Sequence, residues 1–347
     1  MMNNNEVFIA LGNKEKNFVC SSGDKPIFDF NTLSAIYYTN TDNISIKKTM
    51  LEDYLIIEDI HNTILLQLRV NDSPLNKFSL FNENVYLFLY NEEIFCVSNS
   101  TNNSKITITN LAQTKKKEIP FSGDAFLYCK ERNLIVIKTK TTVVILSLLN
   151  IFDNANVITK EFPLYDNNTI SHNTCNNVKI TERFILLFYT YNWSCVAYII
   201  DLELAQCLTC FHLENKKNTL ILFDKNSGVP YFDDSNINLN NKVLILLNSI
   251  SSQCEIYDIK YYTILKQLLN DPATMEIRQI VPNKYWFIIS NYYYIYDVEK
   301  ESYVQKISNL MPNSFVITEK YFIYHSGKGI YKLNININNN FIEKNNV

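Results

Sequence analysis

A pattern of roughly 40 residues recurs along this chain and constrains its fold more than any other feature. In the clearest two copies, residues 254–266 and 294–306, a β-rich run is followed by an aspartate, a short polar turn and a second β-rich run. Further copies lie at 198–203, 106–119 and 27–38, and weaker copies end near Arg69, Ser147 and Lys332. We therefore predict one small antiparallel unit repeated along the whole chain.

The expected ends of the third strand of each unit set the predicted architecture. They fall near residues 29, 69, 110, 147, 201, 258, 297 and 332. This spacing is typical of the blades of a β-propeller, each a four-stranded antiparallel sheet. We predict an all-β fold and a single propeller domain over residues 1–347. No linker rich in proline, glycine or serine interrupts the repeat.

A second marker has the same period. A polar turn precedes strongly apolar runs at 54–57, 184–187, 243–246, 285–288 and 321–323. Runs that are apolar on both faces indicate inner strands between neighbouring sheets. Residues 263–268 mix polar and apolar side chains, which predicts an outer strand. With 23 Tyr and 21 Phe but only six Gly and eight Pro, the composition also favours strands.

From Val7 to Ile342 the chain resembles the WD-repeat and WD-like β-propeller superfamily. In that family the third strand commonly ends in Trp-Asp; the matching pairs here are Phe28-Asp29, Ile200-Asp201, Tyr257-Asp258 and Tyr296-Asp297. The family's Gly-His pair is absent, so the resemblance is to a divergent member. It implies seven blades, often with one blade shared between the chain ends. We count eight units in the sequence. Residues 7–39 and residues 314–343 each contain enough expected strands for a full blade, which favours eight blades, and both seven and eight blades stay open.

The recurring aspartates are interpreted as structural. A short acceptor at one place in successive blades can bind backbone amides and fix the following turn. We expect replacement of one of them by alanine to cost about 0.5–2 kcal/mol of stability. These repeat positions are Asp29, Asp201, Asp258 and Asp297.

Charge and the lack of long apolar runs limit the partners and the compartment. A formal net charge of -3 gives no overall attraction to nucleic acid. No apolar run reaches the roughly 18 residues of a membrane-spanning helix, and no secretion signal is visible. We expect a protein of the cytoplasm, the nucleus or both, with its eight cysteines as free thiols. Binding of a polyanion, either a phosphoinositide or a nucleic acid, remains an alternative because the chain has local lysine clusters. These clusters lie at 47–48, 115–117 and 216–217.

Candidate chemistry is sparse. Cys207, Cys210 and His212 form the most metal-like string, but residues three apart on a strand point to opposite faces, which argues against one ion. His172 and Cys175 share a long segment, 150–177, without a recognisable catalytic signature. We therefore predict no catalytic residue, no metal and no cofactor. A hydrolase-type enzyme with a site in the central channel stays as an alternative.

The remaining candidates belong to an interface with other proteins. Tyrosine is enriched in binding hot spots, and long segments such as 225–241 are often functional. The predicted interface residues are Tyr261, Tyr262, Tyr292, Tyr293, Asp233 and Asp234. Since a rigid ring of blades can present several partners at fixed angles, the sequence favours a non-catalytic scaffold or adaptor subunit of a multiprotein complex.

Overall fold

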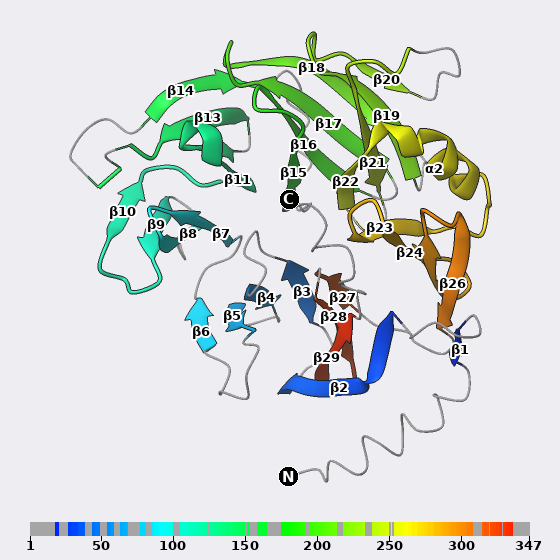
Figure 1. Ribbon diagram of the computed structural model, residues 1–347. Coiled ribbons are helices and arrows are strands. Elements are labelled where there is room, and N and C mark those ends of the chain that lie inside the picture. Colours follow the sequence, from blue (N-terminus) through cyan, green and yellow to red (C-terminus); the bar gives the residue numbers. More distant parts are fainter. Residues whose placement is uncertain are drawn as a thin grey trace, which may run out of the picture. The chain divides into compact units, whose positions relative to one another are not determined.

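The computed structural model divides the chain into two compact units, residues 1–79 with 271–347 and residues 80–270 (Figure 1). The single domain expected over residues 1–347 stays a prediction. The structure describes residues 18–20, 27–38, 44–48, 54–58, 63–68, 77–80, 85–99, 105–123, 125–139, 141–149, 151–152, 158–164, 175–191, 194–213, 218–232, 238–249, 251, 253–307, 314–318, 320–327 and 329–335.

The unit of residues 80–270 contains four antiparallel sheets. In three of them the strands follow each other in chain order. These are β7 (Tyr86–Tyr90), β8 (Glu93–Asn99), β9 (Ile106–Asn110) and β10 (Lys116–Ile119); β11 (Ala125–Cys129), β12 (Leu134–Lys138), β13 (Thr142–Ser147) and β14 (Ile158–Pro163), with the 3-10 helix η2 (Lys130–Arg132); and β15 (Cys175–Lys179), β16 (Phe184–Tyr191), β17 (Ser194–Asp201) and β18 (Gln206–Leu213).

The fourth sheet departs from chain order. It runs β20-β19-β21-β22, made of β19 (Asn218–Asp224), β20 (Pro230–Phe232), β21 (Lys242–Asn248) and β22 (Gln253–Tyr257). Strand β20 lies within the predicted long segment 225–241 and folds back on β19 through Gly228, whose φ of +75° favours glycine. A Cβ there would also meet Leu208 at 2.7 Å and Phe184 at 2.9 Å. Glycine is therefore required at this turn.

The other unit contains three sheets. One is formed by β3 (Ser45–Lys48), β4 (Tyr54–Glu58), β5 (Thr63–Gln67) and β6 (Lys77–Leu80). The second has the order β2-β29-β28-β27, with β2 (Phe28–Tyr38), β27 (Ser314–Ile317), β28 (Tyr321–Ser326) and β29 (Gly329–Ile335). The third has the order β1-β26-β25-β24-β23, with β1 (Phe18–Cys20), β23 (Glu276–Val281), β24 (Tyr285–Ile289), β25 (Tyr293–Asp297) and β26 (Ser302–Ile307).

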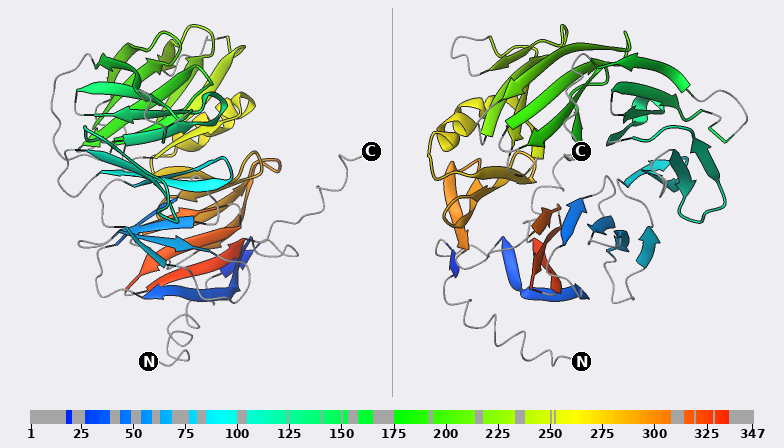
Figure 2. Two further views of the ribbon diagram at one scale, coloured as in Figure 1. Left: turned by 90° about the vertical axis from the view of Figure 1, so that its left-hand side faces the viewer. Right: turned by 180° about the vertical axis from the view of Figure 1, so that it is seen from behind.

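Strand β2 completes the blade of the last three strands, and this corrects the count of eight. It pairs antiparallel with β29 from Phe28↔Ile335 to Tyr38↔Gly329, and Figure 2 shows the blue strand beside the red ones. The backbone N–H of Asn334 donates to Thr32 Oγ1 at 2.8 Å. The sequence unit predicted to end near residue 29 therefore supplies one strand, β2, to the blade that is built from the unit ending near residue 332. The two predicted units form a single blade.

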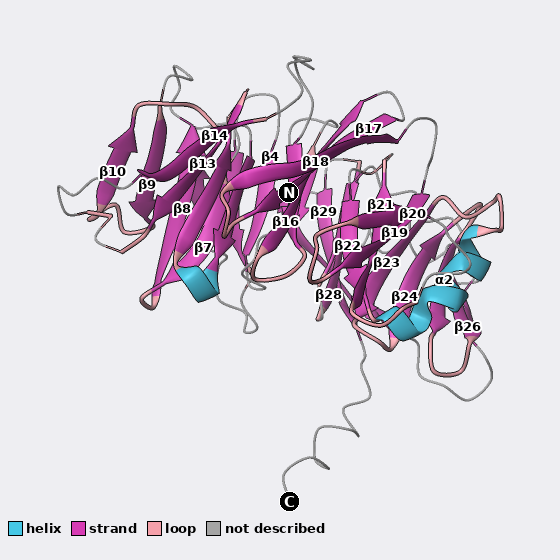
Figure 3. Cartoon of the chain, turned by 90° about the horizontal axis from the view of Figure 1, so that it is seen from above, coloured by secondary structure: helices cyan, strands magenta, loops and turns pink. Residues whose placement is uncertain are grey.

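The seven sheets confirm the predicted fold class. They are four-stranded antiparallel blades of a β-propeller, three in one unit and four in the other, and one blade carries β1 as an additional fifth strand. Strands dominate the described residues, shown in magenta in Figure 3, and no helix among these residues is long and apolar enough to cross a membrane.

Apolar side chains on both faces of the middle strands hold neighbouring sheets together. In β16, Phe184, Leu186 and Phe188 belong to the core shared with β19 and β21. Ile185 and Leu187, which alternate with them, belong to the core shared with the sheet of β11–β14. The predicted inner position of such strands is thus confirmed, because both faces of the strand are removed from water.

Residues 262–269 correct another expectation. Where an outer strand was predicted over 263–268, the chain forms the 3-10 helix η3 (Ile259–Tyr261) and the helix α2 (Tyr262–Leu269), drawn in cyan in Figure 3. The carboxylate of Asp258 accepts the backbone N–H of Lys260 at 3.1 Å and caps the first turn. The Leu-Lys-Gln-Leu-Leu sequence consists of strong helix formers, and Leu265 is fully buried.

His325 provides a test of the blade that β2 completes. Its side chain has no exposed surface, and no described residue hydrogen-bonds to either ring nitrogen. We expect His325→Leu to raise the free energy of unfolding by about 1–2 kcal/mol, because a buried polar ring without partners is replaced by an apolar side chain. Urea denaturation followed by circular dichroism measures the change, with exposed His212→Leu as control. A loss of stability in His325→Leu alone would contradict this account.

Candidate functional site

The predicted site residues fall into three groups. Asp233, Asp234 and His172 lie outside the described residues, and so do the side chains of Asp29 and Cys175. Tyr261 is buried at the end of η3, and Tyr262 opens α2 with its hydroxyl buried and without a hydrogen-bond partner among the described residues. Tyr292 and Tyr293 lie at the start of β25, where the candidate site is found.

The described aspartates at the third-strand ends bind the backbone of the turns that follow them. Asp201 Oδ1 accepts the N–H groups of Glu203 at 2.8 Å and Leu204 at 3.1 Å. Asp297 Oδ1 accepts the N–H of Lys300 at 3.0 Å. Such bonds fix the start of a turn and provide an acceptor for backbone N–H groups that do not pair with a neighbouring strand. The geometry suits a structural role at these positions.

Asp201 also forms an ion pair that is buried at its carboxylate and partly exposed at Arg183. Its carboxylate has no exposed surface, and Oδ2 accepts Arg183 Nε at 2.9 Å and Nη2 at 2.7 Å. Burial raises the pKa of Asp201, but the hydrogen bonds from Arg183 and from two backbone amides outweigh it, and the pKa is lowered. The group is therefore an ionised structural anchor at neutral pH.

The structure corrects the expected orientation of Cys207 and Cys210 in the metal-like string that ends at His212. A bulge in β18 opposite Ile199 and Ile200 shifts the register, so that Cys207 and Cys210 both pack on the core shared with β11–β14. They do not point to opposite faces as expected, because the bulge inserts one residue. The Cys207 thiol donates to the Thr209 carbonyl at 3.5 Å. Among the described residues, no group of three His, Cys, Asp or Glu is placed to hold a metal ion.

The thiols of the described cysteines are free and have the properties of core side chains. Burial raises the pKa of Cys96 and Cys195 to about 12, and that of Cys129 to about 11. Since the thiolate is the nucleophile, such thiols are inert at neutral pH.

Among the residues that the structure describes, exposed aromatic side chains gather on one face of the sheet of β23–β26. The register places Trp286 beside Tyr296, and Tyr294 beside Lys306. The Trp286 and Tyr296 rings are stacked at 6.1 Å between centroids, and Tyr303 contacts Tyr296 at 5.3 Å and Tyr294 at 5.1 Å. The result is one continuous ladder of rings, buried at Trp286 and increasingly exposed towards its end.

We call the exposed end of this ladder the tyrosine face; it consists of Tyr292, Tyr294, Tyr303 and Lys306. Tyr292 is 43% exposed and Tyr303 is 50% exposed. Lys306 Nζ lies 3.6 Å from the centre of the Tyr292 ring and 5.9 Å from that of Tyr294. This is cation–π geometry. No carboxylate among the described residues forms an ion pair with Lys306.

The opposite face of the same sheet is core. The Tyr293 ring stacks on Phe287 at 5.6 Å with an angle of 12° between the planes, and both pack against β28. Tyr292 and Tyr293, named together from the sequence, therefore differ in environment: one is exposed and one contributes to packing. The sequence reasoning did not select Tyr303 and Lys306. Residues three apart in a regular strand lie on opposite faces, and the register shift of β26 opposite Ile295 and Tyr296 brings both side chains to one face.

Electrostatics keep the tyrosine hydroxyls protonated. Burial, with the carboxylate of Asp271 nearby, raises the pKa of Tyr303. Burial, followed by the carboxylate of Glu301, raises the pKa of Tyr296. At neutral pH these side chains are uncharged rings with a hydroxyl that donates and accepts hydrogen bonds. The single cation in the tyrosine face is Lys306.

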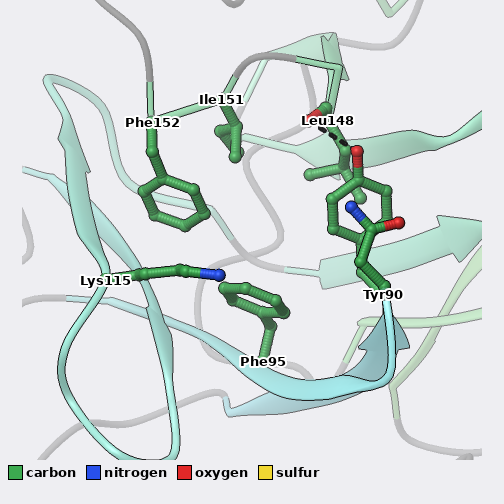
Figure 4. Close-up of a pocket in the computed structure, with 7 residues that line it drawn as sticks. Tyr90, Phe95, Lys115, Leu148, Ile151 and Phe152 are labelled. Atoms are coloured by element: carbon green, nitrogen blue, oxygen red, sulfur yellow. Dashed lines mark hydrogen bonds between the residues drawn. The ribbon is translucent and has the colours of Figure 1, made fainter.

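A shallow cavity of about 210 Å³ lies in the unit of residues 80–270 (Figure 4). Tyr90 Oη donates to the Leu148 carbonyl at 3.2 Å, and the Phe95 and Phe152 rings are stacked at 5.5 Å. Lys115 reaches over Phe95, and its ammonium pairs with Glu93 at 2.5 Å. The cavity is thus apolar with a compensated cation, and it holds no acid–base pair. Its lining is Tyr90, Asn91, Phe95, Lys115, Leu148, Ile151 and Phe152.

Comparisons with known proteins find distant likenesses among solved structures alone. The sequence matches no protein-family model, and no curated protein matches it. Among solved structures, Hsv2 of Kluyveromyces lactis is 10% identical with a TM-score of 0.40, covering 85% of this chain and 98% of that one. The WD40 domain of Toxoplasma gondii coronin is 8% identical with a TM-score of 0.42, covering 88% and 87%.

BamB of Moraxella catarrhalis is 8% identical with a TM-score of 0.41, covering 87% of this chain and 99% of that one. Likenesses of this size carry no information about what the chain binds. The assignment rests on the molecule itself, through the seven antiparallel sheets and the aspartates that end the third strands β17 and β25. By these features the chain folds as a β-propeller whose third-strand aspartates resemble those of WD-like propellers.

Proposed function

We propose that this chain is a non-catalytic scaffold that binds other proteins, and that the tyrosine face is one of its binding surfaces. The observation that carries the proposal is the pair of exposed rings, Tyr292 and Tyr303, at the end of a ladder whose other end is buried. Tyrosines fixed by packing lose little conformational entropy on binding, and tyrosine is enriched in hot spots. A partner could therefore gain contact area without ordering the surface.

The two alternatives have less support. The lysines predicted as a polyanion patch at 115–117 include two in ion pairs: Lys115 with Glu93 at 2.5 Å and Lys116 with Glu118 at 2.8 Å. Paired lysines contribute little net field to attract phosphates. For an enzyme, the described residues bring no two candidate groups into a cavity; the apolar cavity of Figure 4 contains only the compensated Lys115.

The compartment that we propose is the cytoplasm or the nucleus. The support is the set of free thiols at Cys96, Cys129, Cys195, Cys207, Cys210 and Cys254. Disulfides are rare in reducing compartments and common in secreted proteins.

The experiment is affinity purification of the tagged protein from its native cell, with a moderate-salt wash and quantitative mass spectrometry. We expect stoichiometric partner proteins with wild type and an about tenfold or greater loss of at least one of them with the double variant Tyr292→Ala and Tyr303→Ala, because hot-spot truncations cost about 2 kcal/mol or more.

The matched control removes exposed apolar side chains elsewhere. Leu89 is 46% exposed and Leu204 is 57% exposed, both in the other unit. The double variant Leu89→Ala and Leu204→Ala is expected to retain the partner that depends on the tyrosines. If wild type captures no protein, the scaffold proposal fails; if both double variants capture the same partners as wild type, the tyrosine face is not the binding surface.

A further inference from the structure

The apolar cavity of Figure 4 has aromatic walls that are fixed in place. The Phe95 and Phe152 rings are stacked at 5.5 Å between centroids, and the Tyr90 ring meets Phe95 edge-on at 6.2 Å. Phe95 belongs to a buried core cluster, and the Tyr90 hydroxyl is held by the Leu148 carbonyl. Walls that are already ordered lose little conformational entropy when the cavity is filled. The cavity is therefore preformed.

The volume of the cavity limits the size of its occupant. Pockets for drug-sized ligands measure about 300–1,000 Å³, whereas an apolar cavity of about 150 Å³ binds a single benzene ring. At about 210 Å³ this cavity is smaller than the first class and large enough for one aromatic ring. The size therefore fits one aromatic side chain rather than a whole small-molecule ligand.

The charges in the lining select an uncharged occupant. Lys115 lines the cavity, and its ammonium pairs with Glu93 at 2.5 Å. This ammonium would repel a cation. An anion would have to compete with Glu93, which already accepts hydrogen bonds from Lys115 and Asn110. A neutral aromatic ring needs no counter-ion and can present its π face to the ammonium. The lining thus favours a neutral aromatic ring over a charged group.

Leu149 indicates that the ring belongs to a protein. This residue lies between Leu148 and Ile151 of the cavity lining, and its side chain is 61% exposed. Among the described residues, no other large apolar side chain is more exposed. A free aromatic molecule inside the cavity would leave Leu149 in water, whereas a polypeptide that carries the ring can also cover it. Exposed apolar surface beside a pocket is typical of protein-binding sites.

We propose that this cavity is an anchor pocket for one uncharged aromatic side chain of a partner protein, whose flanking residues cover Leu149. The inference rests on the proposed scaffold function and adds a second binding surface, in the unit of residues 80–270. At the tyrosine face the scaffold supplies the rings, whereas here it supplies the cavity and the partner supplies the ring. Aromatic side chains that fill preformed pockets are typical hot spots of protein interfaces.

The test uses the full chain and the fluorescein-labelled peptide Gly-Ser-Leu-Trp-Leu-Ser-Gly, with its central tryptophan kept or replaced by leucine, glutamate or lysine. Fluorescence anisotropy is expected to show the tryptophan peptide binding about tenfold more tightly than the leucine peptide, because the ring fills more of the cavity and contacts the ammonium. The glutamate and lysine peptides should bind most weakly. N-acetyl-tryptophanamide, which cannot cover Leu149, should bind at least about tenfold more weakly than the tryptophan peptide.

Three substitutions locate the contact. Phe152→Ala removes one wall and is expected to weaken the tryptophan peptide about tenfold. Lys115→Gln should weaken this peptide about threefold and leave the leucine peptide unchanged. Leu149→Ala should weaken the tryptophan peptide about threefold without changing the affinity for N-acetyl-tryptophanamide. Phe121→Ala is the matched control, because the Phe121 ring packs on the same core cluster but does not line the cavity, and it should leave every affinity unchanged.

Circular dichroism of each variant checks that the fold is retained. Equal affinities of the tryptophan and leucine peptides, or equal effects of Phe152→Ala and Phe121→Ala, would overturn the inference. Binding of N-acetyl-tryptophanamide as tight as that of the tryptophan peptide, with no response of the peptide to Leu149→Ala, would also overturn it and assign the cavity to a free aromatic molecule. The scaffold proposal is judged separately, by the partner proteins captured from the cell and by their loss in the tyrosine double variant.

Discussion

Replacing Asp201 with alanine is expected to lower the free energy of unfolding by about 3 kcal/mol, one of the two largest effects of a single substitution that we predict. The carboxylate is fully buried and accepts two hydrogen bonds from Arg183 and two from the backbone of the following turn. Its removal leaves the two backbone amides without an acceptor and leaves the Arg183 guanidinium with Glu203, at 3.3 Å, as its remaining counter-ion. Urea denaturation followed by circular dichroism measures the loss.

Asp258→Ala is the matched control. Asp258 occupies the same place in its repeat, but its side chain is 37% exposed and accepts one backbone amide, that of Lys260. We expect a cost of about 1 kcal/mol, as for loss of a helix cap. Equal costs for Asp201→Ala and Asp258→Ala would show that the ion pair with Arg183 adds nothing.

The ion pair also gives the Asp201 contribution a defined pH dependence. The pKa of Asp201 is lowered in the folded chain. Its contribution to the free energy of unfolding is therefore fully present above the pKa of an unfolded aspartate, about 3.9, and is lost as the pH falls through the pKa of the folded state. Wild type should therefore be more stable than Asp201→Asn at neutral pH, and the difference should shrink below about pH 4. A difference that grew on acidification would have the wrong sign.

Phe28→Ala is expected to cost about 3–4 kcal/mol. Phe28 has no exposed surface, its ring stacks on Phe322 at 4.8 Å, and it lies 5.7 Å from the Phe287 ring. A large cavity would open between two sheets if the ring were removed. The same denaturation assay measures this loss.

The control for Phe28 lies in the same strand. Tyr38, at the other end of β2, is 57% exposed, and Tyr38→Ala is expected to change stability by no more than about 0.5 kcal/mol. A small effect of Phe28→Ala would contradict the shared blade, because residues 27–38 would then not be part of the folded core. The pair of variants thus tests the correction from eight blades to seven.

The repeat made much of the fold predictable. Predicted third-strand ends at 110, 147, 201 and 297 coincide with the ends of β9, β13, β17 and β25. The signal is strong because each middle strand is buried on both faces and each turn that follows needs an acceptor side chain. Local chemistry and tertiary packing agree at these places.

Three features could not be read from local sequence. The pairing of β2 with β29 joins residues about 300 apart, as between Thr32 and Asn334. A strand that completes a distant blade and a strand within its own blade have the same alternation. Helix α2 replaces a strand although residues 261–266 match the repeat, and the bulge in β18 moves Cys207 to the face of Cys210.

The candidate site was predictable only in part. Tyr292 stands out as one of three successive tyrosines, but its exposure and the burial of its neighbour Tyr293 depend on the register of β25 with β24 and β26. Tyr303 and Lys306 belong to the site because the strand pairing brings them beside Tyr296 and Tyr294. Arg183 likewise precedes its partner Asp201 by 18 residues, and only the antiparallel pairing of β16 with β17 joins them.

The blade that contains β2 has a consequence for protein synthesis. Its hydrogen bond between Thr32 and Asn334 spans 302 residues, so translation at about 5–20 residues per second leaves β2 without β29 for about 15–60 s. During that interval an apolar strand with an open edge is available to other nascent chains and to chaperones. Ribosome-associated chaperones should therefore contact this strand until residues 329–335 have left the ribosome.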